Sequence, residues 1–295
     1  MPSEHRIPAR AMALLAVVLW STAASAFKLS LRYFSPYMLL LLSSAVSLAV
    51  LWGLDLARGG GRTLPGRRAA VRGLLNPFLY YLVLLTAYDM LPAQIAMVIN
   101  YLWPIMLVLL SIPVLGQGIG LVGVGAVLVS FSGVAVLALG AGGDLSGAGL
   151  GPMLLALLST VIWAAYWLLN MKSRGSGVSA LRGNFQWGLL YLLAYGLITG
   201  ALEAPAGRGL LGAAYVGLFE MSLTYVVWLA ALSRARTTAE VSSMIYLTPF
   251  LSLLVIAVSV GERISPWTVA GLVLVIAGIV LERGLGRVGA VGGRG

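Results

Sequence analysis

Cysteine is absent from this 295-residue chain, and histidine occurs once, as His5. The lack of cysteine excludes disulfides, thiolate metal sites and cysteine nucleophiles. A single histidine in the N-terminal tail excludes a histidine-based metal site and a membrane-embedded Ser and His pair. No Gly-x-x-x-x-Gly-Lys phosphate loop occurs, which argues against ATP hydrolysis. The sequence therefore predicts a protein that is not an enzyme and that carries no cofactor or metal.

Charged residues are also scarce, at 9% of the chain, whereas hydrophobic residues make up 60%. Soluble domains carry about 25% charged residues, so this chain lacks the polar surface that water requires. We expect an all-α integral membrane protein whose partner is the lipid bilayer. The net charge of +10 does not indicate nucleic acid as a partner, because nearly all the arginines lie in short connectors between apolar runs.

Ten apolar segments reach the length of about 20 residues that a membrane-spanning helix needs. The first of them continues too far, to about Leu31, for a signal peptide, and is interpreted as a spanning helix. The predicted spans are Ala9–Leu31, Pro36–Ala57, Ala70–Leu91, Ala93–Leu115, Gly118–Leu139, Ala148–Met171, Ser179–Ala201, Leu210–Ser233, Thr237–Val260 and Pro266–Leu281.

The basic residues predict the orientation of these spans. With the N-terminus inside, 15 of the 19 Lys and Arg residues fall on the cytoplasmic side. The opposite side receives only Lys28, Arg32, Arg208 and Arg263. This asymmetry predicts that both termini are cytoplasmic, which an even number of spans also requires.

An internal repeat relates residues 93–116 to residues 239–261. In each copy a proline, Pro104 or Pro249, is followed 12 positions later by Gly116 or Gly261 and 29 positions later by Gly133 or Gly278. Each half contains five spans, an odd number, so the two repeats are predicted to be inverted. Inverted repeats are a signature of secondary transporters, whose substrate site lies where the repeats meet and which work by alternating access.

Aromatic and polar residues near the middle of several spans are the candidates for a substrate site. Ser159, Trp163, Trp167 and Asn170 are spaced four, four and three apart and share one helical face. Such side chains suit a neutral or zwitterionic small molecule, and organic cations also fit through cation–π contacts. Packing within the helix bundle is the alternative for each of them. The substrate-binding candidates are Trp20, Tyr80, Tyr81, Tyr88, Asn100, Tyr101, Trp103, Trp163, Trp167, Asn170 and Tyr246.

Three further residues have candidate roles in the transport cycle. Pro104 and Pro249 remove a backbone hydrogen bond inside their predicted helices, so both are candidate hinges. Glu220 is the one acidic residue near the centre of a predicted span, where a carboxylate is costly. It is a candidate for coupling to an ion or for contact with a substrate amine, and a structural staple between helices is the alternative.

These features resemble the drug/metabolite transporter superfamily, in its ten-helix form built from two EamA-like repeats. The resemblance rests on Leu19-Trp20-Ser21, Ser35-Pro36, the two prolines and Gly261-Glu262, and it covers nearly the whole chain. It implies one repeat in residues 1–140, a second in 146–284 and a cytoplasmic tail in 285–295. The first repeat has Gln117 where the second has Glu262, so no role of the family's glutamate is assigned to Gln117.

The chain is similar in particular to bacterial exporters of the YddG type, which implies the substrate, the direction and the location of transport. The substrate would be an amino acid, aromatic or otherwise neutral, exported across the bacterial inner membrane by a protein functional as a monomer. A multidrug or organic-cation exporter of the same superfamily is the alternative within transport. A membrane scaffold without transport activity is the alternative outside it.

Overall fold

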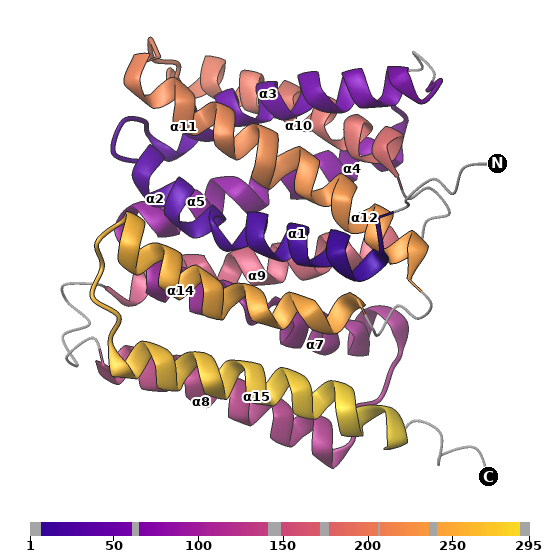
Figure 1. The fold of residues 1–295 in the computed structure, drawn as a ribbon, viewed down its shortest axis with the longest axis vertical. Helices are drawn as coiled ribbons and strands as arrows, with labels where there is room; N and C mark the ends of the chain where they lie inside the picture. The colour runs from indigo at the N-terminus through magenta and orange to yellow at the C-terminus, as the bar shows by residue number, and fades with distance from the viewer. Residues whose placement is uncertain are drawn as a thin grey trace. The chain divides into compact units, whose positions relative to one another are not determined.

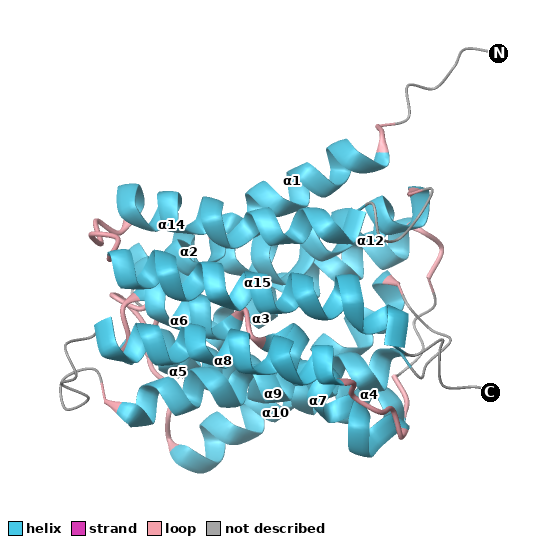
Figure 2. Ribbon diagram, turned by 90° about the horizontal axis from the view of Figure 1, so that it is seen from below, coloured by secondary structure: helices cyan, strands magenta, loops and turns pink. Residues whose placement is uncertain are grey.

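The computed structural model describes residues 7–60, 65–140, 149–171, 177–205, 207–235 and 241–289 (Figure 1). Every regular element within these ranges is helical, and none is a strand (Figure 2). Eight helical segments of the described ranges are long and apolar enough to cross a membrane, and Ser243–Ser259 is apolar but shorter. The prediction of an all-helical fold is confirmed for the described ranges.

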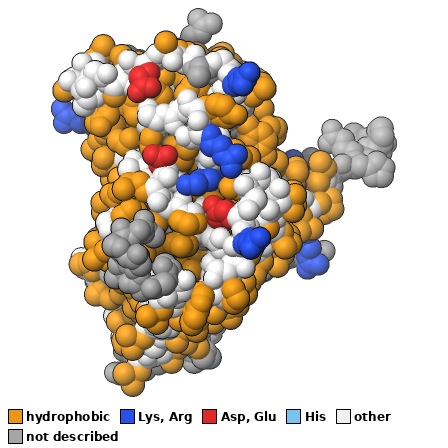
Figure 3. Space-filling model, turned by 90° about the vertical axis from the view of Figure 1, so that its left-hand side faces the viewer, with side chains coloured by type: hydrophobic (Ala, Val, Ile, Leu, Met, Phe, Trp, Pro, Cys, Tyr) orange, Lys and Arg blue, Asp and Glu red, His pale blue; other side chains and the backbone are white. Residues whose placement is uncertain are grey.

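Apolar side chains also cover most of the surface, as expected of a chain that lies in lipid. Charged side chains are few on the face seen in Figure 3. Leu128, Leu254 and Val258 are 66%, 65% and 88% exposed, and many other large apolar side chains are exposed as well. Water-soluble monomers rarely expose large apolar patches, so these side chains are suited to contact lipid tails.

The helices form two compact units, each assembled from both halves of the chain. Unit 1 comprises residues 1–73 and 175–260. Its helices are α1 (Ala9–Ser21), α2 (Ala23–Ser30), α3 (Pro36–Ala57), α4 (Arg67–Gly73), α10 (Val178–Thr199), η2 (Gly207–Gly209), α11 (Leu210–Tyr215), η3 (Val216–Leu223), α12 (Thr224–Arg234), η4 (Ser243–Leu247) and α14 (Thr248–Ser259).

Unit 1 is held together by small buried residues and by hydroxyl groups that bond to backbone carbonyls. Helix α1 packs against α12 and α14, with Ala13 and Ala16 next to Trp228. Helix α3 packs against α10, where the Tyr37 hydroxyl donates to the Leu192 carbonyl at 3.0 Å. The Ser43 hydroxyl of α3 donates to the Ala213 carbonyl of α11 at 3.0 Å. Small residues and hydroxyls are typical of helix contacts in membranes because they allow the backbones to approach closely.

Unit 2 comprises residues 74–174 and 261–295. Its helices are η1 (Leu74–Leu79), α5 (Tyr80–Met90), α6 (Ala93–Asn100), α7 (Trp103–Leu115), α8 (Leu121–Gly140), α9 (Leu150–Met171) and α15 (Pro266–Gly289). Helix α9 packs against α5, α6 and α7, and α8 lies along α15 (Figure 1). The α8–α15 contact depends on glycine, because a Cβ at Gly133 would lie 2.5 Å from the Gly271 carbonyl oxygen.

Four of the predicted spans are interrupted, and in the ninth the 3₁₀ segment η4 precedes α14. The first is divided at Thr22 between α1 and α2, and the fourth is divided at Tyr101 and Leu102 between α6 and α7. In the third, Asn76 has non-helical φ and ψ of −145° and 119°, next to Pro77. Interrupted helices are common where transporters place their binding sites.

Residues matched by the sequence repeat have similar local structure. Gly116 and Gly261 both have a positive φ, of 66° and 82°, which favours glycine. Pro104 and Pro249 both lie in the first turn of a helix, α7 and α14, instead of in a helix interior. Proline fits a first turn because the N–H that it lacks has no helical partner there.

Candidate functional site

The break between α6 and α7 positions Asn100 and Trp103 in unit 2. Pro104 has no N–H, so the Asn100 carbonyl cannot accept the helical hydrogen bond from a residue four positions later. Helix α6 therefore ends at Asn100, and α7 begins at Trp103 after a short turn in which the Leu102 N–H donates to the Ile99 carbonyl at 3.0 Å. The turn leaves Asn100, Tyr101 and Trp103 partly exposed.

A chain of hydrogen bonds joins three helices of unit 2 at this break. The Tyr80 hydroxyl of α5 donates to Asn100 Oδ1 at 3.4 Å, and Asn100 Nδ2 donates to Ser159 Oγ of α9 at 3.2 Å. Ser159 Oγ in turn donates to the Ala156 carbonyl at 2.6 Å. Because the Asn100 amide is held on both sides, it is oriented before any ligand arrives.

Aromatic rings surround these hydrogen bonds. The rings belong to Tyr80, Trp103, Trp163, Tyr166 and Trp167, which we call the unit 2 aromatic cluster. The ring centroid of Trp163 lies 4.5 Å from that of Tyr80 and 5.4 Å from that of Tyr166, with both pairs stacked. Trp167 lies edge-on to Trp163 at 6.0 Å and stacks with Trp103 at 6.2 Å. Each such pair contributes about 0.5–1.5 kcal/mol beyond its area of contact. Trp163 is 8% exposed, whereas Trp103 and Trp167 are partly exposed.

The remaining candidates of unit 2 have varied surroundings. Tyr81 and Tyr88 are 1% and 3% exposed, so they pack inside the protein, and Tyr81 lies edge-on to Tyr80 at 4.8 Å. Asn170 Nδ2 donates to the Tyr166 carbonyl at 2.8 Å and holds one turn of α9. The structure thus brings Tyr80, Asn100, Trp103, Trp163 and Trp167 together, whereas Tyr81 and Tyr88 are buried.

Unit 1 holds the other candidates, Trp20, Glu220, Tyr246 and Pro249. Trp20 lies 5.3 Å from Tyr225 in an edge-on contact and 5.6 Å from Trp228. Glu220 lies in the π-helical segment η3 and is partly buried, as is Tyr246 in η4. Pro249 follows η4 in the first turn of α14. The binding, coupling and hinge roles of these residues remain predictions.

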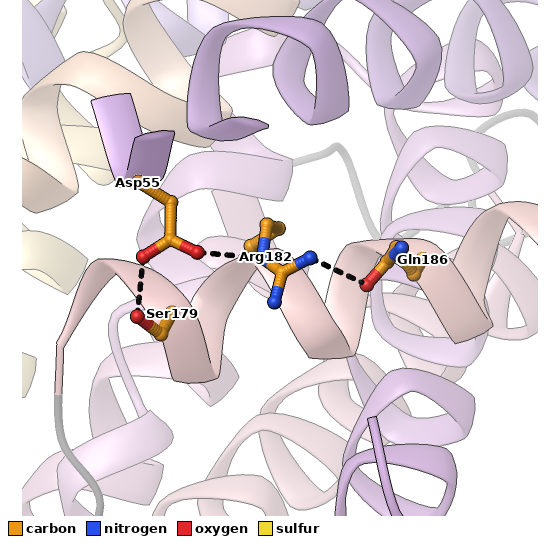
Figure 4. Close-up of polar contacts among 4 residues, drawn as sticks. All are labelled: Asp55, Ser179, Arg182 and Gln186. Carbon is orange, nitrogen blue, oxygen red and sulfur yellow. Dashed lines mark hydrogen bonds and ion pairs between the residues drawn. The ribbon is translucent and has the colours of Figure 1, made fainter. Parts of the chain in front are cut away.

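Two polar networks were not predicted from the sequence. In unit 1, Asp55 of α3 forms an ion pair with Arg182 of α10, with 2.9 Å between Oδ2 and Nε, and accepts a hydrogen bond from Ser179 (Figure 4). The Arg182 guanidinium also donates to Gln186 Oε1 at 3.4 Å and lies 5.1 Å from the Trp52 ring centroid. Both charged side chains are only 5% exposed.

The second network fastens the loop before α15 to the start of α6 in unit 2. The Glu262 carboxylate accepts hydrogen bonds from the Ala93 N–H at 2.7 Å and the Gln94 N–H at 3.2 Å. The Gln94 side chain donates to the Arg263 carbonyl at 3.0 Å and accepts from the Thr268 hydroxyl at 2.7 Å. Glu262 therefore acts as the N-terminal cap of α6.

Sequence reasoning also missed Tyr166 and Asn76. Tyr166 lies three residues after Trp163 on α9, a spacing that could have indicated their contact. Asn76 is 1% exposed, and neither polar atom of its side chain has a hydrogen-bond partner in the described part of the chain. Its position beside Pro77 was the only sequence signal. No group of three or more His, Cys, Asp or Glu side chains suited to a metal occurs among the described residues.

Comparison with known families gives two matches along the chain. The family described as the EamA-like transporter family matches residues 8–139 and again residues 150–282. A solved crystal structure shares the fold, with a TM-score of 0.67 at 22% identity, covering 95% of this chain and 98% of the other.

Several curated bacterial proteins are similar in sequence. An aromatic amino acid exporter, YddG, of Ancylobacter novellus is 24% identical, covering 92% of this chain and 96% of the exporter. A probable terminal-alkyne amino-acid exporter of Streptantibioticus cattleyicolor is 28% identical, with 92% and 93% covered. An uncharacterized transporter, YvbV, of Bacillus subtilis is 29% identical, with 72% and 70% covered.

Proposed function

Because this chain belongs to the EamA-like transporter family of the drug/metabolite transporter superfamily, we propose that it exports aromatic and other neutral amino acids across a bacterial inner membrane. Two of the similar proteins are named as amino acid exporters, and all three come from bacteria. These names support the substrate class and the direction of transport.

The observation that carries the proposal is the unit 2 aromatic cluster with its central amide, Asn100. Asp89 is the one charged residue in residues 74–140 and 150–171. Stacked rings bind a planar apolar group without a fixed charge, and the amide and hydroxyl groups beside them can orient a polar group. An aromatic amino acid combines a planar ring with a small zwitterionic end, and it fits this arrangement.

The proposal includes ten spans, with α10 and Ser243–Ser259 crossing the membrane in addition to the eight apolar segments. Arg182, Asn184 and Gln186 lower the hydropathy of α10, but the ion pair of Arg182 with Asp55 reduces the cost of its charge in lipid. Ten spans and the distribution of basic residues support cytoplasmic termini.

We further propose that the two halves, residues 1–140 and 146–284, are inverted repeats that exchange conformations during alternating access. The packing supports this, because α1 contacts α12 and α14 in unit 1 as α9 contacts α5 and α7 in unit 2. Helices α1 and α9 belong to the first span of their halves, α5 and α12 to the third, and α7 and α14 to the fourth. Pro104 and Pro249 are the proposed hinges, since each follows an interruption of its span. Both repeats lie in one chain, so a monomer is proposed to suffice.

Export of organic cations is the second candidate, and Glu220 favours it. A partly buried carboxylate in the π-helical segment of a span can attract a cationic substrate. The two candidates differ in their substrate preference, because a cation without a carboxylate should be carried as well as an amino acid only if the second is right.

Transport in proteoliposomes tests both candidates. We would measure counterflow of labelled phenylalanine, tyrosine, leucine and tetramethylammonium with wild type, Trp163→Phe and Trp163→Ala. Trp163→Ala is expected to raise the phenylalanine KM about tenfold, the factor that a loss of roughly 1.4 kcal/mol produces. Trp163→Phe keeps an aromatic face and should remain close to wild type. Trp267→Ala is the matched control, because Trp267 is 51% exposed and lies outside the cluster.

The outcomes separate the candidates. Phenylalanine flux that is weakened by Trp163→Ala and unaffected by Trp267→Ala supports amino acid export through the cluster. Flux of tetramethylammonium alone would support the cation exporter. A protein with a sharp thermal unfolding transition and no flux of any tested compound would contradict both.

A further inference from the structure

Two buried polar groups of unit 2 have no partner within the described part of the chain. One is the Trp167 indole Nε1–H, a donor only. The other is the Asn76 amide, whose Nδ2 and Oδ1 are both unpaired although the residue is 1% exposed. Proteins pair the large majority of their buried polar groups, so unpaired groups of this kind call for a ligand or water that completes them.

The two groups lie at the same level of unit 2. Asn100 contacts Ser159 and Trp103 contacts Trp167, so α6 and α7 run parallel to α9. Helix α5 precedes α6 by a tight turn at Leu91 and Pro92 and therefore runs in the opposite direction to α9.

The stack of Tyr80 on Trp163 fixes the register of these antiparallel helices. Asn76 comes four residues before Tyr80, and Trp167 comes four residues after Trp163. Both therefore lie on the same side of the stack. The segment η1, which contains Asn76, also packs against α9.

We propose that Trp167 Nε1–H and the Asn76 amide bind the carboxylate of the transported amino acid while its side chain stacks on the unit 2 aromatic cluster. Residues 74–140 and 150–171 contain no Lys or Arg, so these neutral donors take the place of an ion pair. This inference rests on the proposed function and adds how the site chooses its substrate.

The arrangement discriminates against organic cations. A site built to bond a polar group rejects an analogue that lacks it, because the site's own donors are then left unpaired. Phenethylamine has the ring and ammonium group of phenylalanine and lacks the carboxylate. The wild-type protein should therefore carry phenylalanine with a KM at least about tenfold below that of phenethylamine.

Two substitutions remove the donors and keep the shape. Trp167→Phe retains an aromatic ring and loses the N–H, and Asn76→Leu is similar in size and has no polar atom. Each is expected to raise the KM for phenylalanine about tenfold and to leave that for phenethylamine within about twofold, since one hydrogen bond to a charged group is lost. Trp267→Phe is the matched control outside the cluster.

Thermal unfolding of the purified full-length protein separates binding from structure. Asn76→Leu should unfold at a temperature no lower than wild type does, because replacing an unpaired buried amide removes a desolvation cost. The proposal is supported if the KM rises for phenylalanine and not for phenethylamine while the unfolding temperature does not fall.

Three results would overturn it. One is equal loss of phenylalanine and phenethylamine transport in both variants, which would show a packing role. Another is an unchanged KM for phenylalanine in both variants. Either leaves amino acid export intact, whereas absence of all amino acid flux in folded wild type overturns this inference together with the proposed function.

Discussion

At the scale of single residues, Asp55 and Arg182 show how unit 1 accommodates charge. Each side chain is 5% exposed, and the two form an ion pair with 2.9 Å between Arg182 Nε and Asp55 Oδ2. Ser179 donates a further hydrogen bond to Asp55, the guanidinium donates one to Gln186, and the Trp52 ring faces the guanidinium. A buried pair with these additional contacts lets α3 and α10 pack with a fixed register, although its net contribution is small because desolvation opposes the attraction.

Substitution of one member of this ion pair should lower the stability of the folded protein much more than substitution of both members. Asp55→Asn leaves the Arg182 charge buried and is expected to lower the stability of the protein by about 3–5 kcal/mol. The double variant Asp55→Leu, Arg182→Met replaces the pair with apolar side chains and should recover most of that loss. Thermal unfolding in detergent measures the order of the three proteins. A double variant as unstable as Asp55→Asn would contradict the prediction.

The residues of the candidate site were predictable only in part. Spacing along one helix predicted that Trp163, Trp167 and Asn170 share a face, because helical periodicity is a local property. Asn76 was missed, since its importance lies in the absence of partners, and that depends on every residue packed around it. The same holds for the Asn100 amide, whose partners Tyr80 and Ser159 lie on other helices.

At the scale of helices and loops, the positions of glycine, proline and arginine in the sequence predicted where the spans end. The predicted span Pro36–Ala57 coincides with α3, and Ser35 accepts a hydrogen bond from the Met38 N–H at 3.3 Å as its cap. The interruption at Thr22 was not predicted, because no proline or glycine marks it. The predicted kinks at Pro104 and Pro249 are short non-α-helical turns followed by new helices.

Glu262 illustrates how a loop fixes a helix, and it suggests a test. Its carboxylate accepts from two N–H groups at the start of α6, where the helix dipole also favours negative charge. Glu262→Gln removes the charge and is expected to lower stability by about 1 kcal/mol. Glu203→Gln, in an exposed position, is the control. Equal thermal unfolding shifts in the two variants would show that the cap contributes nothing.

At the scale of the whole molecule, the two compact units do not follow the halves of the sequence. Unit 1 combines α1 and α3 with α10, α12 and α14, and unit 2 combines α5, α7 and α8 with α9 and α15. A repeat in the sequence indicates which helices correspond, but it does not indicate which ones pack together. That choice depends on complementary surfaces between distant segments, such as the contact of Gly133 with Gly271.

The proposed ten spans can be tested because the chain has no cysteine. Single cysteines at Arg67 and Glu203, both exposed, would be separated by five spans if α10 crosses the membrane and by four if it does not. In intact cells, a membrane-impermeant maleimide should therefore label Glu203→Cys and leave Arg67→Cys unmodified until the membrane is permeabilised. Labelling of both cysteines from the same side would show that α10 does not cross the membrane. The two halves would then contain unequal numbers of spans, and alternating access by inverted repeats would lose its structural basis.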